Sequence, residues 1–245
     1  MPALPTTLVL VHGGTFTSTM WDEVVPRLHT PALAVDLPGR RYRPADLSRV
    51  SRHTWVQSVC DDLRLAGLTD VVLVGHSSGG YVIPGVAAMM PEVVRGLVFV
   101  AATVPAEGRP PIDYLRPDLR SLALETREAT AAHCRGKTLG GLRPGEPAIE
   151  TDLEIVENGP RMGLEAPWPL HEVFSWGGFP VEVPRTYVRC LRDRVIPPDL
   201  ADVMIANMGG AAVADIDAGH GVAMRAPVEL AAVLDRCAPP GHPAG

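Results

Sequence analysis

A serine flanked by glycines is the first candidate for chemistry in this chain. Residues 75–79 read Gly-His-Ser-Ser-Gly, a match to the pattern G-x-S-x-G, and they directly follow the apolar run 71–74. A sharp turn between a strand and a helix lifts a serine hydroxyl above the edge of a sheet, and the glycines let the neighbouring backbone approach. The same residues could form a phosphate-binding loop or an ordinary turn, but their placement favours Ser77 as a nucleophile. His76 would point away from the exposed side of the serine, so we expect it to be structural.

A serine hydroxyl needs a base that takes its proton and an acid that orients the base. His220 lies between two glycines after the last predicted strand, and Asp193 lies just beyond an earlier strand. The loops at the carboxyl ends of parallel strands share one edge of a sheet, so these side chains can converge on Ser77. Asp215 and Asp217 are rival acids, but one falls within a strand and the other only three residues before His220. We therefore predict His220 as the base and Asp193 as the orienting acid.

Acyl transfer also needs N–H donors that face the developing oxyanion. Ser78, which follows the nucleophile, is predicted to supply one backbone donor. The second donor is predicted to come from the loop His12-Gly13-Gly14, with Gly14 as the first choice and Gly13 or Thr15 as alternatives. We expect His12 to shape this loop rather than to accept a proton.

These residues must be positioned by the elements around them, and the pattern of those elements is typical of α/β proteins. Short apolar runs alternate with longer amphipathic segments, which indicates βαβ units and a mainly parallel sheet of about six strands flanked by helices. The predicted strands are 7–11, 32–35, 71–74, 97–101, 187–191 and 211–216. The predicted helices are 20–28, 53–66, 79–90, 198–208 and 228–237. Pro84 falls inside the third helix, where we expect a kink or a lost hydrogen bond.

The alternation breaks down between about residues 103 and 182, where prolines are frequent. We interpret residues 104–182 as an inserted cap, with helices over 121–134 and 151–157. Residues 1–103 and 183–238 then form the core, and 239–245 a frayed tail. Four aromatic residues of the cap are predicted to line a substrate pocket or to pack the cap on the core: Trp168, Phe174, Trp176 and Phe179.

Composition limits the range of partners. The formal net charge is -6, and Lys137 is the single lysine among scattered arginines, so we expect no nucleic-acid partner. The four cysteines are widely spaced, which argues against structural zinc and against a disulfide framework. No apolar run approaches the length of a membrane span, and the first residues lack the features of a secretory signal. We expect a cytoplasmic protein that acts on a small molecule without a membrane partner.

These motifs together resemble the α/β-hydrolase superfamily. The resemblance rests on five segments: Val-His-Gly-Gly at 11–14 with Trp21 soon after, Asp-Leu-Pro-Gly at 36–39, Gly-His-Ser-Ser-Gly-Gly at 75–80, Arg-Asp-Arg-Val-Ile-Pro at 192–197 and Ala-Gly-His at 218–220. Within the superfamily, the chain is similar to the branch of plant methylesterases and hydroxynitrile lyase-like proteins and to their bacterial relatives. The match covers the core in the expected order and hardly touches the cap.

The resemblance implies an α/β-hydrolase fold that uses no metal and no cofactor. It implies a site made of a triad and two oxyanion donors: Ser77, Asp193 and His220, with Gly14 and Ser78. The cyanide-eliminating members carry a hydroxyl residue at the position of Gly13 and a lysine beside the catalytic histidine, where this chain has Gly221. Lyase chemistry is thereby disfavoured.

We therefore expect a serine hydrolase that cleaves a small, mainly apolar ester, lactone or thioester through an acyl-enzyme. A second hypothesis keeps the fold and the triad but makes the protein a lyase or cyclase of a biosynthetic pathway, with His220 as the base. A third is a small-molecule-binding module of the receptor kind.

Overall fold

The computed structural model describes residues 5–40, 42–117, 120–121, 124, 166, 168–180 and 182–238. Six parallel strands form one sheet in the order β2-β1-β3-β4-β5-β6. Their bounds are β1 Thr7–Val11, β2 Ala32–Val35, β3 Val71–His76, β4 Val94–Val100, β5 Arg185–Cys190 and β6 Ala212–Ile216. The predicted α/β fold with about six mainly parallel strands is confirmed.

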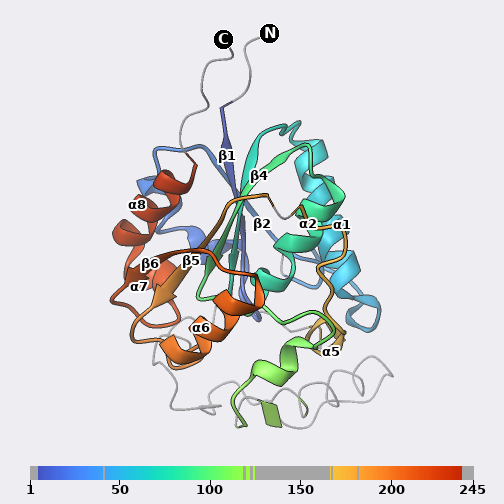
Figure 1. The fold of residues 1–245 in the computed structure, drawn as a ribbon. Coiled ribbons are helices and arrows are strands. Elements are labelled where there is room, and N and C mark those ends of the chain that lie inside the picture. The colour runs from blue at the N-terminus through green and yellow to red at the C-terminus, as the bar shows by residue number, and fades with distance from the viewer. Residues whose placement is uncertain are drawn as a thin grey trace.

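Helices cover both faces of this sheet (Figure 1). The α-helices are α1 Arg52–Leu65, α2 Ile83–Met89, α5 Trp168–His171, α6 Pro198–Asn207, α7 Val222–Arg225 and α8 Pro227–Cys237. Short 3-10 helices occur as η1 Ser18–Trp21, η2 Val25–Arg27, η3 Leu47–Arg49, η4 Ser77–Tyr81 and η5 Pro111–Tyr114. In Figure 1, α1 and α2 lie on one side of the strands, and α7 and α8 lie on the other. None of the helices in the described part of the chain is long and apolar enough to cross a membrane.

The sheet separates two apolar clusters because successive side chains of a strand point to opposite faces. In β1, Val9 and Val11 belong to the cluster beneath α1 and α2, whereas Leu8 and Leu10 belong to the cluster beneath α8. All five residues of β1 are buried. A strand buried on both faces is a continuous apolar run, which is why the sequence predicted this strand correctly.

Two predicted helices are wrong in form. The segment predicted as a helix over 20–28 is two short 3-10 helices, and Pro26 lies in the first turn of the second. The helix predicted over 79–90 is likewise divided into η4 and α2. Because α2 begins at Ile83, Pro84 stands in its first turn. Proline is tolerated there since the missing N–H would have no partner within the helix, so Pro84 costs α2 no internal hydrogen bond.

The predicted cap is described only at its two ends. The expected helix 151–157 and the tail 239–245 lie outside the described residues, and so does the helix 121–134 except for residues 121 and 124. The described ends carry η5 and α5, which contact each other. The cap therefore stays a prediction.

Candidate active site

Ser77 lies at the sharp turn between β3 and η4. Its φ is +49°, in the left-handed region that non-glycine residues rarely adopt, and such strain is often found at functional sites. The turn leaves no space around its glycines: a Cβ added to Gly75 would lie 2.6 Å from the carbonyl oxygen of Gly79. A Cβ added to Gly79 would lie 2.9 Å from the carbonyl oxygen of Val11. The two glycines of the G-x-S-x-G pattern are therefore required by close backbone packing.

Ser77, His220 and Asp193 form a continuous chain of hydrogen-bond contacts at the carboxyl ends of the strands. His220 Nε2 lies 3.0 Å from Ser77 Oγ, and His220 Nδ1 lies 2.8 Å from Asp193 Oδ2. A carboxylate only accepts hydrogen bonds, so Nδ1 carries a proton and Nε2 is free to accept the Ser77 hydroxyl. Asp193 and His220 are each 4% exposed. The geometry is that of a hydroxyl, a base and an orienting acid.

Asp193 is held as a carboxylate by its surroundings. Its Oδ1 accepts bonds from the amides of Val195 at 2.8 Å and Ile196 at 2.9 Å. Burial alone would raise the pKa of Asp193, but the contact with His220 and the two amide bonds together lower it below its usual value. The acid is therefore ionised at neutral pH and aligned with the imidazole.

The rival acids point elsewhere. Asp215 forms a two-pronged pair with Arg189, at 2.8 and 3.1 Å, and Asp217 lies 2.8 Å from Arg192. The structure thus brings Asp193, rather than either rival, to His220.

The loop after β1 lies beside Ser77. A Cβ added to Gly13 would lie 2.9 Å from Ser77 Cβ and 2.7 Å from His76 Nδ1, so this position has no room for a side chain. Thr15 has a φ of +61°, and its hydroxyl donates to the carbonyl oxygen of Gly14 at 2.7 Å. The loop predicted to supply an oxyanion donor is therefore tightly packed against the proposed nucleophile.

His76 has a role that the motif alone did not reveal. Its Nε2 lies 2.9 Å from the carbonyl oxygen of His220, and the two ring centroids are 4.8 Å apart. Phe16 and Trp21 present their rings edgewise to it. Burial, with a smaller contribution from His220, lowers the pKa of His76 to about 3. His76 is thus a neutral ring that holds the backbone of His220, a tertiary contact without a sequence signal.

The aromatic residues predicted to line a pocket differ in their surroundings. Phe174 is 0% exposed and lies in the core. The Arg52 guanidinium carbon lies over the Phe174 ring, 4.7 Å from the ring centroid. Trp176 contacts both Phe174 and Phe179 edgewise, at centroid distances of 5.2 Å, and is half-buried against the core. Trp168 begins α5. Phe174, Trp176 and Phe179 therefore make packing contacts, and the role of all four aromatic residues in substrate binding stays a prediction.

Arg52 connects residues 174–179, which carry three of the aromatic side chains, with Tyr81 at the end of η4. Its Nε donates to the carbonyl oxygen of Tyr81 at 2.9 Å, and its Nη2 donates to that of Ser175 at 3.1 Å. The Glu172 carboxylate accepts the Arg52 amide at the first turn of α1. The sequence placed Arg52 just before a predicted helix and gave no indication of these long-range contacts.

Among the described residues there is no group of three or more histidine, cysteine or acidic side chains that could hold a metal ion.

Comparison with known proteins agrees with this geometry. A family model described as "Alpha/beta hydrolase family" matches residues 8–233. The pyrethroid hydrolase of Sphingobium wenxiniae is 28% identical over 252 residues, which cover 94% of this chain and 86% of that protein. The alpha-hydroxynitrile lyase of Arabidopsis thaliana is 27% identical, with 91% of this chain and 93% of that protein covered. Two putative chloroplastic methylesterases of the same plant match over only 34% of their own length.

A solved structure supports the fold independently. It is that of an extracellular alpha/beta-hydrolase from a Paenibacillus species, described as sharing structural and functional homology with tobacco salicylic acid binding protein 2. The TM-score is 0.79 at 21% identity, and the alignment covers 96% of this chain and 99% of that chain. The predicted resemblance to plant methylesterases, hydroxynitrile lyases and bacterial relatives is confirmed. The predicted enzyme class, an α/β hydrolase acting on ester bonds, is confirmed by the family match and by relatives named pyrethroid hydrolase, methylesterase and carbendazim hydrolyzing esterase.

Proposed function

Because the chain belongs to the alpha/beta hydrolase family, we propose that it is a serine esterase that works through an acyl-enzyme. The observation that carries the proposal is the chain of contacts from Ser77 Oγ through His220 to Asp193, at 3.0 and 2.8 Å. His220 accepts the proton of Ser77 as the hydroxyl attacks the ester carbonyl, and then donates it to the leaving alkoxide. In the second half of the reaction, His220 takes a proton from a water molecule that attacks the acyl-enzyme, and returns it to Ser77 Oγ as the carboxylic acid leaves.

The oxyanion that forms in each step needs donors. We assign them to the backbone N–H of Ser78, which follows the nucleophile, and to that of Gly14 in the loop beside it. The support for Gly14 is the close approach of its neighbour Gly13 to Ser77 Cβ. Loss of one such donor typically lowers kcat about 100-fold to 1000-fold.

The substrate proposed is a small, mainly apolar ester, lactone or thioester. Relatives are named for the hydrolysis of pyrethroids and of carbendazim, and others are named methylesterases. We propose that the cap over 104–182 sets the choice among such substrates. The location proposed from the sequence is cytoplasmic.

The lyase hypothesis has one specific observation in its favour, the relative named alpha-hydroxynitrile lyase. The surroundings of Gly13 weigh against it. A side chain there would meet His76 and Ser77 within 3 Å, so the hydroxyl residue of cyanide-eliminating members does not fit without a rearrangement. Gly221 also leaves the position beside His220 without a lysine. Hydrolysis is therefore the proposal.

The test combines covalent labelling with turnover. A fluorophosphonate probe is expected to label the wild-type protein, and p-nitrophenyl esters of varied acyl length are expected to be hydrolysed. Ser77→Ala should abolish labelling and turnover while leaving the thermal unfolding curve unchanged. Labelling that persists in this variant would refute the assignment. Turnover of a cyanohydrin by a variant that no longer labels would favour a lyase.

A further inference from the structure

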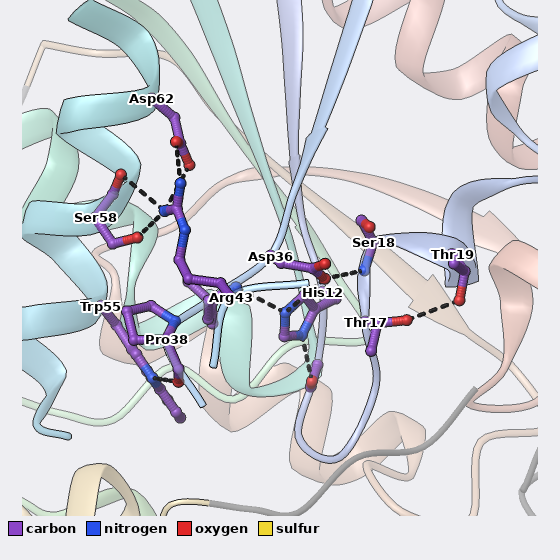
Figure 2. A network of polar contacts seen from close by, with 12 residues as sticks. His12, Thr17, Ser18, Thr19, Asp36, Pro38, Arg43, Trp55, Ser58 and Asp62 are labelled. Carbon is purple, nitrogen blue, oxygen red and sulfur yellow. Dashed lines mark hydrogen bonds and ion pairs between the residues drawn. The ribbon is translucent and has the colours of Figure 1, made fainter. Parts of the chain in front are cut away.

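The His12 ring is fully buried between two backbone groups. Its Nδ1 lies 2.8 Å from the carbonyl oxygen of Gly13, and its Nε2 lies 3.1 Å from the amide nitrogen of Leu37 in the loop after β2. Figure 2 shows the ring next to Asp36, whose carboxylate accepts the Ser18 amide at 2.6 Å. The ring therefore connects the loop after β1 with the loop after β2.

These two contacts fix where the ring carries its proton. An amide N–H can only donate, so Nε2 must present its lone pair to Leu37. A carbonyl oxygen can only accept, so Nδ1 must carry the hydrogen that faces Gly13. The chemistry of the partners thus assigns the Nδ1–H tautomer to His12.

The ring is also held neutral. Burial, followed by the charge of Arg40, lowers the pKa of His12 to about 3, against a smaller raising effect of the bond to Gly13. Asp36 Oδ1 lies 3.9 Å from Nε2, beyond hydrogen-bond distance. A proton on Nε2 would point directly at the Leu37 N–H. His12 therefore keeps one donor and one acceptor at neutral pH.

The bond to Gly13 has a consequence one residue further on. The carbonyl of Gly13 and the N–H of Gly14 belong to the same peptide group, which is trans, so they point in opposite directions. Fixing the carbonyl against His12 fixes the direction of the Gly14 N–H. Both residues are glycines, whose backbone rotates with little steric hindrance, so this peptide needs an external restraint.

We propose that His12 is a positioning residue that holds the Gly13–Gly14 peptide with the Gly14 N–H directed at the oxyanion. The inference rests on the proposed function, in which Gly14 supplies that donor. The other contact of the ring, with Leu37, sets the ring's orientation and its tautomer. His12 itself does not exchange a proton during the reaction.

The experiment separates the two sides of the ring. In His12→Asn, the side-chain amide reaches the position of Nδ1 and can still donate to Gly13, but the acceptor for Leu37 is lost. In His12→Gln, the amide oxygen reaches the position of Nε2 and accepts from Leu37, but the donor to Gly13 is lost. The matched control is His29→Gln, because the His29 ring is exposed and contacts Asp235 at the surface.

With p-nitrophenyl butyrate as substrate, His12→Gln is expected to lower kcat about 100-fold, the scale of losing one oxyanion donor, with KM within threefold. His12→Asn should lose less than about 10-fold, and His29→Gln should match the wild type. A trifluoromethyl ketone, which forms a tetrahedral adduct with the serine, should bind the Gln variant weaker by the same factor as kcat falls. The pH midpoint of kcat/KM should not move.

A Gln variant within threefold of the wild-type kcat, or equal losses in Asn and Gln, would overturn the proposal. If neither variant folds, 15N NMR of the wild-type histidines decides: the Nδ1–H tautomer of His12 from pH 5.5 to 8 supports it, and an Nε2–H or titrating ring refutes it. Ser77→Ala is measured in parallel. Should Ser77→Ala retain activity, the proposed function fails, whereas its inactivity together with an unaffected His12→Gln makes only this inference fail.

Discussion

Replacing Asp193 by asparagine tests the orienting acid, because the structure dictates how the new amide must sit. Asp193 Oδ1 accepts the amides of Val195 and Ile196, and Oδ2 faces His220 Nδ1 at 2.8 Å. The asparagine oxygen must take the Oδ1 position, since an NH2 group there would face two N–H donors. The asparagine NH2 then faces His220 and forces the proton from Nδ1 to Nε2. That tautomer donates to Ser77 Oγ and cannot accept its proton.

The expected loss in kcat is about 10⁴-fold, the size seen when a serine protease is given the same wrong tautomer. This factor corresponds to about 5 kcal/mol of transition-state stabilisation. Steady-state hydrolysis of p-nitrophenyl butyrate measures it, after titration with the fluorophosphonate counts competent sites. The matched control is Asp217→Asn, an exposed carboxylate paired with Arg192, which should stay within twofold. Equal losses in the two variants, or less than 10-fold in Asp193→Asn, would refute the reasoning.

Three further predictions concern stability, packing and selectivity. Because the folded-state pKa of Asp193 is lowered, its carboxylate stabilises the fold above the ordinary carboxyl pKa, and this stabilisation is lost as the pH falls through the folded-state pKa. The difference in unfolding free energy between wild type and Asp193→Asn should therefore shrink in acid. Urea unfolding at a series of pH values measures it. Gly13→Ala should cost about 1–3 kcal/mol of stability by overpacking and should also lower kcat. Gly96→Ala should be tolerated better, because a Cβ added there would lie 3.5 Å from its nearest neighbour, and equal melting temperatures of the two variants would contradict this. Single alanine variants of the four cap aromatics, Trp168, Phe174, Trp176 and Phe179, should leave phosphonate labelling within a few-fold of the wild type. At one position at least, the ratio of kcat/KM for bulky esters to that for small esters should shift about 10-fold. An unchanged ranking of the esters in all four variants would assign these residues to packing alone.

The sequence predicted those features that depend on short segments. Strands such as Thr7–Val11 are buried on both faces and are read directly from a continuous apolar run. The glycines of the G-x-S-x-G pattern are likewise explained by local structure, because Gly75 and Gly79 have no room for a Cβ. The choice of Asp193 over its rivals followed from the common edge of a parallel sheet, and the structure brings it to His220.

Features that depend on contacts between residues distant in sequence could not be predicted from local patterns. The segment 20–28 has the apolar spacing of a helix, but it forms parts of η1 and η2 instead. Met20 and Trp21 of η1, and Val24 just before η2, are buried in the cluster under α8. Packing against the core outweighed helical periodicity there. Arg52 is similar: its partners Tyr81 and Ser175 are distant in sequence, so no local pattern reveals the contact.

His12 and His76, two buried histidines near the site, have protonation patterns that the sequence did not predict either. Nε2 of His12 faces an amide and must accept, whereas Nε2 of His76 faces the carbonyl of His220 and must donate, so the two rings adopt opposite tautomers. Burial lowers both pKa values to about 3, and both rings stay neutral. In the proposed reaction only His220 gains a proton, and its positive charge then faces the carboxylate of Asp193 without repulsion from a second imidazolium. Neutral neighbours are thus a condition for the base to take the serine proton, and only the folded arrangement of amides and carbonyls establishes it.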